Sequence, residues 1–528
     1  MKIRIADFKG EIPRFHPRIL PQNFATSARN TRLDDGTIAP VRQSGLAHTL
    51  ASDADTIFLH KGTWQSFSGD VDVVPGPVAD DRLYLTGSGA PKMRVSGTDY
   101  NLALPAPSAA PNTSLSGTID EEVAQFVTYA YTFVTSFDEE SAPSPVSSAF
   151  LWSAGQVVTV SGFSAPVSGR SVDRIRLYRS ITSGIGITDL YFVAEFPIGT
   201  SSYAHDVEAD PLQEVLPSAD YDPPPSTMSG LISMPNGMMA AFDGKEVLFS
   251  EPFRPHAWPE KYRLTVDADV VALASFASTL VILTTASPYI ATGTHPSSMV
   301  MERMERDLPC LSKRGVVDFG YSAAYPSNEG LVIISGNAAQ TVSQNLFTAE
   351  QWREINPSSF RAARYDNRYF FAYSPLEGGQ ELGIMDLTGT QLFYIQSDDD
   401  PEALHFDPVS GGLYFVEGGR FIYEWDAPSQ PLRAQIWRSR RFQLVSPVSY
   451  AGILVETDPA IGTMPAGATP CTTRIYADGS LVHTTTKINE PARLPGGFRS
   501  KAWEIEIEGY VPVTGISMAQ SYDDLSVA

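Results

Sequence analysis

Short runs of β-branched and aromatic residues, separated by turn-forming residues, constrain this chain more than any other feature of its sequence. Forty glycines and forty prolines are spread along 528 residues and divide runs rich in Val, Ile, Tyr, Phe and Thr. This spacing of glycine and proline between short runs of such residues is typical of strands joined by turns. Helical periodicity is weak, and the one modest candidate is 345–355, where Thr348 is expected to cap a short helix. We therefore predict an all-β protein.

A strand that ends in an acidic elbow is the most regular of these runs. In YAYTFVTSFDEESAPS, residues 129–144, the side chains of Tyr129, Tyr131 and Phe133 share one face by period-two alternation. The acidic elbow at 138–140 and the prolines after it force a turn. Further strands are expected in QVVTVSGF, VDRIRLYRS, DLYFVAEF and TSSYAHDV. Several short strands with turns between them predict a small β-sandwich.

The same segment resembles a fibronectin type III domain over roughly residues 117 to 222. A strand that ends in a turn rich in Asp, Glu, Ser and Pro and a later strand that contains Tyr-Arg carry the resemblance. The matched residues are Asp138, Glu140, Ser141, Pro143, Ser144, Tyr178 and Arg179. The resemblance implies a module of a kind that presents surfaces and rarely catalyses. Proline-rich joints on both sides indicate an insertion that folds by itself.

Strand-rich units recur on both sides of this module. After it, hairpin-like segments repeat about every 40 to 50 residues, which is the spacing of β-propeller blades. One of them, GMMAAFDGKEVLFS, is expected to turn at Asp243 and Gly244. We therefore predict a β-propeller with an inserted fibronectin-like β-sandwich and a C-terminal β-rich platform domain. The predicted ranges are 1–111 (N-terminal arm and first propeller strands), 112–226 (inserted sandwich), 227–430 (remaining blades) and 431–528 (assembly domain).

The chain is strongly acidic, with 38 Lys and Arg against 60 Asp and Glu and a formal net charge of −22. This balance argues against a protein that binds nucleic acid tightly by neutralising its phosphates. It is compatible with a protein that lets DNA pass without binding it. The segment 431–528 is neutral, with nine acidic and nine basic residues. No run approaches the roughly 20 apolar residues of a membrane span, and no signal peptide pattern is present. We therefore expect no membrane anchor.

A search for catalytic and metal-binding patterns identifies no enzyme, and we expect no cofactor and no metal. Cys310 and Cys471 are expected to be reduced and structural. The eight histidines lack metal-ligand spacing, and His295, beside Pro296, is expected to cap a turn. No phosphate loop or nucleotide-binding turn occurs. The aspartates at 398–400 lack the spaced ligands of a calcium loop, so an acidic, solvated loop is the simpler interpretation.

Three groups of segments together resemble the tail nozzle proteins of short-tailed bacteriophages, also called packaged-DNA stabilisation proteins. The first is ILPQNFATSARNTRLDDGTIAPVR, with Leu20, Pro21, Asn23, Ala25, Ala28, Asn30, Gly36 and Pro40. The second comprises FSEPFRPHAWP and RYDNRYFFAY. The third is IYADGSLVHTTTKINEPARLPGGFRSKAWEIEIEG, with Asp478, Gly479, Arg493, Leu494, Pro495, Trp503 and Gly509. The resemblance spans most of the chain, and no nozzle-tip loop matches residue by residue.

This resemblance implies a structural virion protein of a phage tail, made in the host cytoplasm. It implies a homo-oligomeric ring, a hexamer, that retains packaged DNA and conducts double-stranded DNA during ejection without binding it specifically. Contacts with tail adaptor or portal-associated proteins and with tail fibre or needle proteins are implied as well. Two alternatives stay open: a receptor-binding or carbohydrate-recognising tail propeller, and a bacterial surface scaffold.

Two sets of charged residues are the candidate functional residues. Arginines of the neutral segment are candidates for docking an acidic neighbouring subunit or adaptor, with a solvated edge strand as the alternative: Arg433, Arg438, Arg440, Arg441, Arg493 and Arg499. Acidic clusters are candidates for the lining of a negative DNA channel, because an anionic wall repels the duplex over a Debye length of about 8 Å: Asp138, Glu139, Glu140, Asp398, Asp399 and Asp400. The alternative is that these carboxylates only keep a large protein soluble.

Overall fold

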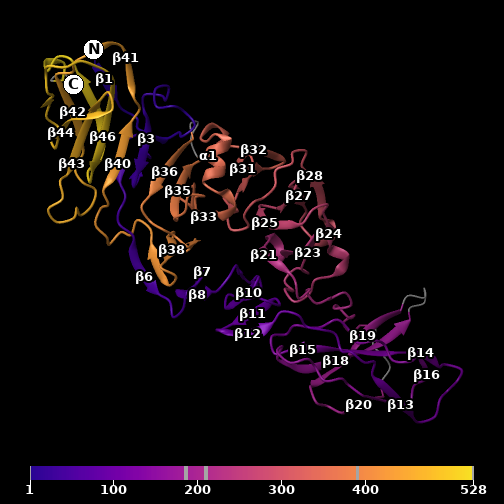
Figure 1. The fold of residues 1–528 in the computed structure, drawn as a ribbon. Coiled ribbons are helices and arrows are strands. Elements are labelled where there is room, and N and C mark those ends of the chain that lie inside the picture. Colours follow the sequence, from indigo (N-terminus) through magenta and orange to yellow (C-terminus); the bar gives the residue numbers. More distant parts are fainter. Residues whose placement is uncertain (1, 183–187, 207–211, 388–391, 526–528) are drawn as a thin grey trace. The chain divides into compact units, whose positions relative to one another are not determined.

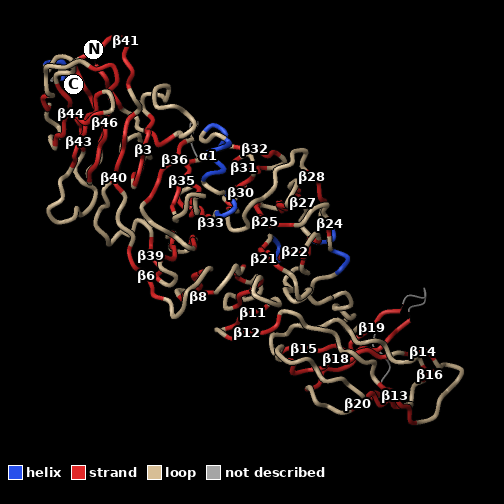
Figure 2. Tube along the Cα trace, in the orientation of Figure 1, coloured by secondary structure: helices blue, strands red, loops and turns tan. Residues whose placement is uncertain are grey.

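Short strands dominate the structure. The computed structural model describes residues 2–182, 188–206, 212–387 and 392–525, and Figures 1 and 2 trace their course. Within these ranges the strands are joined by turns and short 3-10 segments, and α1 (Ala349–Glu354) is the single α-helix. The prediction of an all-β protein is confirmed.

The short helix begins where its capping residue predicted. The Thr348 side chain accepts a hydrogen bond from the backbone N–H of Gln351, and the Gln351 side chain accepts one from the backbone N–H of Thr348. This reciprocal pair satisfies two backbone donors near the start of the helix, where intrahelical partners are lacking. Trp352 is buried and packs against Phe347 and Phe360. The helix is therefore specified locally and held by its one buried tryptophan.

Two compact units divide the chain. The first comprises Met1–Gly69, Leu283–Pro288 and Met304–Ala528, and the second comprises Asp70–Ile282 and Tyr289–Arg303. Each unit contains several small sheets. The four ranges predicted from the sequence remain a prediction of domain organisation.

Strands from both ends of the chain form one β-sandwich in the first unit, the terminal sandwich (Figure 1). One sheet contains, in spatial order, β1 (Lys2–Ile5), β47 (Val513–Ala519), β42 (Gly452–Thr457) and β45 (Ala492–Arg493). The facing sheet contains β2 (Lys9–Glu11), β3 (Phe24–Arg29), β40 (Gln435–Ser439), β46 (Ser500–Gly509), β43 (Cys471–Ala477) and β44 (Ser480–Thr485), and β41 (Phe442–Val448) also pairs with β46. Buried side chains of both sheets, Trp437 and Trp503 among them, share one core. The N-terminal strands therefore complete a domain that is otherwise C-terminal in sequence.

Small antiparallel sheets follow one another along the rest of the first unit. One contains β29 (Val317–Asp318), β30 (Ala323–Ser327), β31 (Gly330–Ser335) and β32 (Ala338–Thr341). The next contains β33 (Arg361–Tyr365), β34 (Arg368–Tyr373), β35 (Glu381–Asp386) and β36 (Phe393–Ser397), and β36 continues into the sheet of β2 and β3. A third contains β37 (Ala403–Phe406), β38 (Leu413–Glu417) and β39 (Phe421–Glu424) and is completed by the N-terminal β6 (Gly45–Thr49). Two ribbons pair β4 (Thr31–Arg32) with β5 (Ala39–Pro40) and β7 (Thr56–His60) with β8 (Thr63–Phe67).

Three further four-stranded sheets lie in the second unit, except for residues 283–284 at the end of one strand, which belong to the first. They contain β9 (Asp72–Pro75), β10 (Arg82–Thr86), β11 (Lys92–Val95) and β12 (Thr98–Asn101); β21 (Ser229–Ser233), β22 (Met239–Asp243), β23 (Glu246–Phe249) and β24 (Leu264–Thr265); and β25 (Val270–Phe276), β26 (Thr279–Thr284), β27 (Tyr289–Thr292) and β28 (Val300–Arg303). Asp243 pairs with Glu246, which confirms the predicted hairpin turn. The first two sheets share a core that contains Tyr84, Leu231 and Trp258.

The segment with the acidic elbow forms a two-sheet β-sandwich, the inserted sandwich. One sheet contains β13 (Asn112–Ser116), β17 (Val157–Ser161) and β20 (Ser202–His205), and the other contains β15 (Tyr129–Thr135), β18 (Val172–Thr182) and β19 (Thr188–Pro197). A ribbon of β14 (Gln125–Val127) and β16 (Phe150–Trp152) extends it. Tyr129, Tyr131 and Phe133 lie in the core between the sheets, as their alternation predicted.

Candidate functional site

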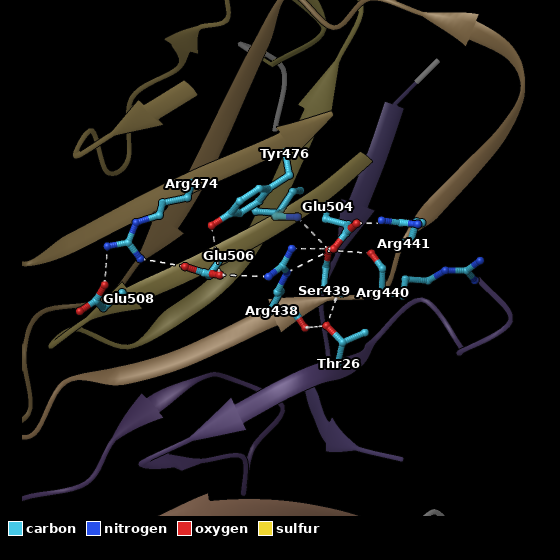
Figure 3. A network of polar contacts seen from close by, with 11 residues as sticks. Thr26, Arg438, Ser439, Arg440, Arg441, Arg474, Tyr476, Glu504, Glu506 and Glu508 are labelled. Carbon is cyan, nitrogen blue, oxygen red and sulfur yellow. Dashed lines mark hydrogen bonds and ion pairs between the residues drawn. The ribbon is translucent and has the colours of Figure 1, made fainter. Parts of the chain in front are cut away.

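An ion-pair ladder covers one face of the large sheet in the terminal sandwich (Figure 3). Along β46, Glu504, Glu506 and Glu508 alternate with Trp503, Ile505 and Ile507, whose side chains are buried in the core. Period-two alternation therefore puts the three carboxylates on the opposite face. Arginines of the neighbouring strands meet them there: Arg438 on β40, Arg474 on β43, and Arg441 between β40 and β41.

Each of these arginines has a carboxylate partner within the chain. Arg438 donates to Glu504 at 2.9 Å, and its guanidinium lies 4.4 Å from the ring centroid of Tyr476. Arg441 donates to the other oxygen of Glu504 at 2.8 Å. Arg474 donates to Glu506 at 2.8 Å and to Glu508 at 2.6 Å, and these bonds, first that to Glu508, raise the pKa of Arg474. Three cations and three anions thus balance on one sheet face.

The other arginines predicted as assembly residues lie in separate environments. Arg433 forms a bidentate pair with Asp399, with both bonds at 2.8 Å. Arg440 donates to the backbone carbonyl of Arg18, and Arg493 lies 5.1 Å from the ring centroid of Tyr522. Arg499 is exposed. The six arginines therefore form no single patch, and their role in docking remains a prediction.

Within the acidic elbow, Glu139 is buried. Its side chain is 6% exposed and pairs at 2.5 Å with Arg170, whose side chain is 0% exposed. Arg82 approaches the other carboxylate oxygen to 3.9 Å and His256 Nδ1 approaches it to 3.8 Å. A carboxylate buried in this way is stable only with such partners, since an unpaired buried charge costs several kcal/mol.

Glu140 is also buried, and it joins two neighbouring strands of one sheet of the inserted sandwich. It accepts hydrogen bonds from Thr132 of β15 and from Tyr178 of β18, at 2.7 and 2.6 Å. Burial, and then the charge of Glu140, raises the pKa of Tyr178, so this phenol stays a donor. Asp138, by contrast, is 83% exposed and pairs with Arg174 at 2.6 Å.

The elbow joins the inserted sandwich to the sheets beside it in the second unit. The Phe137 ring contacts Tyr100 of β12 edge-on, and the Arg82 guanidinium lies 5.2 Å from the Phe137 ring centroid. His256 Nε2 lies 3.0 Å from the backbone carbonyl of Glu140. Burial lowers the pKa of His256 to about 4, although the Glu139 charge opposes the shift, so this histidine is neutral near pH 7 and donates to that carbonyl.

We name the group Arg82, Phe137, Glu139, Arg170 and His256 the elbow junction. Sequence reasoning missed three of its members, Arg82, Arg170 and His256, because they are distant in sequence from the elbow; His256 lies within FSEPFRPHAWP, but nothing in that segment links it to the elbow. No signal in the sequence identified these partners, because only the structure shows that two carboxylates of the elbow are buried and therefore need them. Burial also removes Glu139 and Glu140 from the residues that are able to face DNA, so the channel-lining prediction for this cluster rests on Asp138 alone.

The second acidic cluster is likewise divided. Asp399 is 5% exposed and is held by Arg433, whereas Asp398 is 47% exposed and pairs with Arg29 at 2.7 Å. Burial opposes the shift, but hydrogen bonds from Arg29 and Asn30 lower the pKa of Asp398. Asp400 is exposed, and partial burial, then the charges of Asp399, Glu381 and Asp398, raise its pKa. Asp398 and Asp400 therefore remain candidates for a negative surface.

The described residues contain no group of three or more His, Cys, Asp or Glu arranged to hold a metal ion. Cys310 and Cys471 are free and buried, and burial raises their pKa to about 12 and about 11, as expected for structural thiols. His295 accepts a hydrogen bond from the Ser297 backbone at the start of a 3-10 turn, which confirms its capping role. No helix in the described part of the chain is long and apolar enough to span a membrane.

No protein-family model and no curated protein matches this chain. Among solved structures, the AfRom2 CNH domain is similar with a TM-score of 0.27 and 9% identity, over 62% of this chain and 93% of that one. PorZ, an essential surface component of the type-IX secretion system of Porphyromonas gingivalis, has a TM-score of 0.28 and 10% identity, over 90% of this chain and 77% of that one. Likenesses this weak identify neither a family nor a function.

Proposed function

We propose that this chain is a structural virion protein of a short-tailed phage, which forms a ring-shaped tail nozzle that retains packaged DNA and conducts it during ejection. One observation carries the proposal. The segments at the two ends of the chain that resemble nozzle proteins are more than 400 residues apart in sequence, yet they pack in one core. Shared motif residues that build one domain are expected when a resemblance reflects a common fold.

The motif residues have identifiable structural roles in the terminal sandwich. Ala25 and Ala28 of β3 are buried where that strand pairs with β40, which in turn pairs with β46. Asn30 donates to Asp398 and accepts from the Asp398 backbone. Gly509 faces the backbone of Pro470, and a Cβ at this position would lie 2.4 Å from the Pro470 carbonyl oxygen. These constraints supply a physical reason for those residue types.

We propose further that the serial four-stranded sheets are blades of a β-propeller. Blades of four antiparallel strands follow one another along such a chain, and β6 supplies the last strand of a sheet whose other strands come from residues 403–424. A strand donated from the other end of the chain is a common way to close a propeller. The inserted sandwich is, on this proposal, the fibronectin type III-like module, which presents a surface and does not catalyse.

The negative channel is part of the same proposal and now rests on the exposed carboxylates Asp138, Asp398 and Asp400. A cationic wall would bind DNA by releasing counterions, whereas an anionic wall repels it. Changing Asp398 and Asp400 together to Asn should slow DNA ejection in vitro, because the duplex would approach the wall. Unchanged ejection from intact particles would leave solubility as the role of these charges.

Electron microscopy of purified phage particles and of the isolated chain tests the function. We expect the protein in tail-containing particles, in a ring at the distal end of the tail, and we expect particles that lack it to lose their DNA. The copy number in that ring tests the implied hexamer. Particles that retain and eject DNA normally without this protein, or a receptor-binding position at the side of the tail, would overturn the proposal.

A further inference from the structure

An exposed apolar and acidic surface, the acidic patch, lies at one end of the inserted sandwich. Phe126 of β14 is 67% exposed and stands directly opposite Leu151 of β16, which is 40% exposed. Val123, three residues before Phe126, is 64% exposed. The patch consists of Asp120, Glu121, Glu122, Val123, Phe126 and Leu151.

Hydrogen bonds hold the acidic residues beside the apolar ones. The backbone N–H of Asp120 donates to Ser153 Oγ at 2.8 Å, which ties the acidic turn to the end of β16. The Asp120 carboxylate accepts from the backbone N–H of Glu122 at 3.1 Å and fixes the turn itself. No lysine or arginine occurs between Arg94 and Arg170, and within the described residues the carboxylates at 120–122 form no ion pair. The acidic patch is therefore an apolar surface with an uncompensated negative rim.

A second exposed surface, the basic patch, has the opposite charge and lies on the terminal sandwich. Gln443 of β41 pairs with Ala502, and Val448 pairs with Ser500, so the residues between them form a bulge opposite Lys501. Val445 in this bulge is 96% exposed. Arg499 and Lys501 are exposed, and neither forms an ion pair among the residues that the structure describes. The basic patch is Val445, Arg499 and Lys501.

We propose that the acidic patch of one copy binds the basic patch of the next copy. This inference rests on the proposed ring and names its subunit contact. Both patches join exposed apolar side chains to unpaired charges of one sign, and the two signs are complementary. The acidic patch and the basic patch lie on the same chain and are different surfaces, so the contact between two copies is heterologous. A heterologous contact whose rotation closes generates a ring. The arginines of the ion-pair ladder take no part, since their charges are neutralised within the chain.

Reversal of charge in each patch tests the contact. The acidic variant is Glu121→Lys with Glu122→Lys, and it leaves Asp120 unchanged because that carboxylate holds the turn. The basic variant is Arg499→Glu with Lys501→Glu. Asp80→Lys with Asp81→Lys is the matched control, because these two carboxylates are also exposed, adjacent and in the second unit. Thermal unfolding of each full-length variant checks that it is folded.

Sedimentation velocity of the full chain measures self-association over a range of concentrations and salt. We expect each reversal to weaken self-association by about a hundred-fold, since like charges then face each other across the contact. The control should associate as the wild type does. An equimolar mixture of the acidic and basic variants should recover association, because every junction in an alternating ring of the two is again complementary.

Several outcomes would overturn the inference: a wild-type chain that stays monomeric at every concentration, reversals without effect, or a mixture that does not recover. These outcomes refute the contact between the patches and do not test the tail function. Electron microscopy of phage particles tests that function, because it shows directly whether the ring is present. If the mixture recovers association but the assembly is not a ring, the contact between the two patches is supported. The proposed ring-shaped conduit is then refuted.

Discussion

Replacement of Arg170 by Met tests whether the elbow junction holds the inserted sandwich against the neighbouring sheets. Met retains much of the buried volume and removes the charge. Glu139 then keeps a carboxylate that is only 6% exposed, and its nearest remaining cation is Arg82 at 3.9 Å. The neutral His256, at 3.8 Å, supplies little compensation.

The magnitude follows from the burial of the pair. Removal of one partner of a buried ion pair costs about 3–5 kcal/mol, because the other charge is left without compensation. Two terms reduce this cost: the residual attraction of Arg82, and the loss of the Arg170 atoms Nε and Nη1, which are buried without hydrogen-bond partners. We therefore expect Arg170→Met to destabilise the sandwich and its junction by about 3 kcal/mol. The double variant with Glu139→Gln removes both charges and should cost about 1 kcal/mol.

Hydrogen exchange measured by mass spectrometry reports the local free energy of opening for β15 and β18, and urea unfolding reports the whole chain. Arg306→Met is the matched control: its partner Glu329 lies at 2.7 Å, but both side chains are about half exposed, so we expect a change below about 0.5 kcal/mol. A single Arg170→Met variant as stable as the control would refute the reasoning. So would a double variant that is as unstable as the single one.

Four further predictions concern pH, the ladder, the helix cap and the inserted sandwich. The pKa of His256 is about 4 in the folded chain, below its usual value near 6.5, so the unfolded chain binds the proton first. His256 should therefore contribute about 2 kcal/mol to the fall in stability between pH 7 and pH 5, beside His205 and His405, whose pKa values burial also lowers to about 4. Urea unfolding should show a fall that is smaller by this amount for His256→Gln. Arg438→Met should lower the free energy of unfolding by about 1–2 kcal/mol, because Glu504, which is 9% exposed, loses one of its two cationic partners. Thermal unfolding measures this change. If Arg438 served only for docking, stability would be unchanged. Thr348→Ala should cost about 1 kcal/mol and Thr348→Ser much less, which calorimetry can resolve. A fragment of residues 112–226 should fold but be less stable than the same sandwich in the full chain, because it lacks the contacts of the elbow with Tyr100 and His256; equal protection from exchange in both would contradict this.

Local features of the sequence predicted the class of fold and several of its details. Period-two alternation placed Tyr129, Tyr131 and Phe133 on one buried face, and a capping threonine located the helix. These predictions succeed because backbone sterics and hydrogen bonds between near neighbours act over a few residues. The same local rules predicted the turn at Asp243 and Gly244 and the cap at His295.

The partners of the charged residues were decided only by tertiary structure. The sequence places Arg433, Arg438 and Arg441 in one basic run, whereas the fold divides them between Asp399 and Glu504. The acidic elbow reads as a solvated turn, yet Glu139 meets an arginine that lies 31 residues away. Charge alone cannot distinguish a solvated carboxylate from one buried against a distant guanidinium, because the free energy of either depends on the surroundings.

Strand pairing between the ends of the chain was equally inaccessible to the sequence. The alternation of exposed and buried residues in β1, and of acidic and apolar residues in β46, is typical of strands, but it carries no information about which strand each will pair with. Every strand offers the same backbone donors and acceptors, so partners are selected by the shape of the core that their side chains fill. The sequence by itself thus determined that this protein is built from β-strands, and only the packed core decided that its first strands complete its last domain.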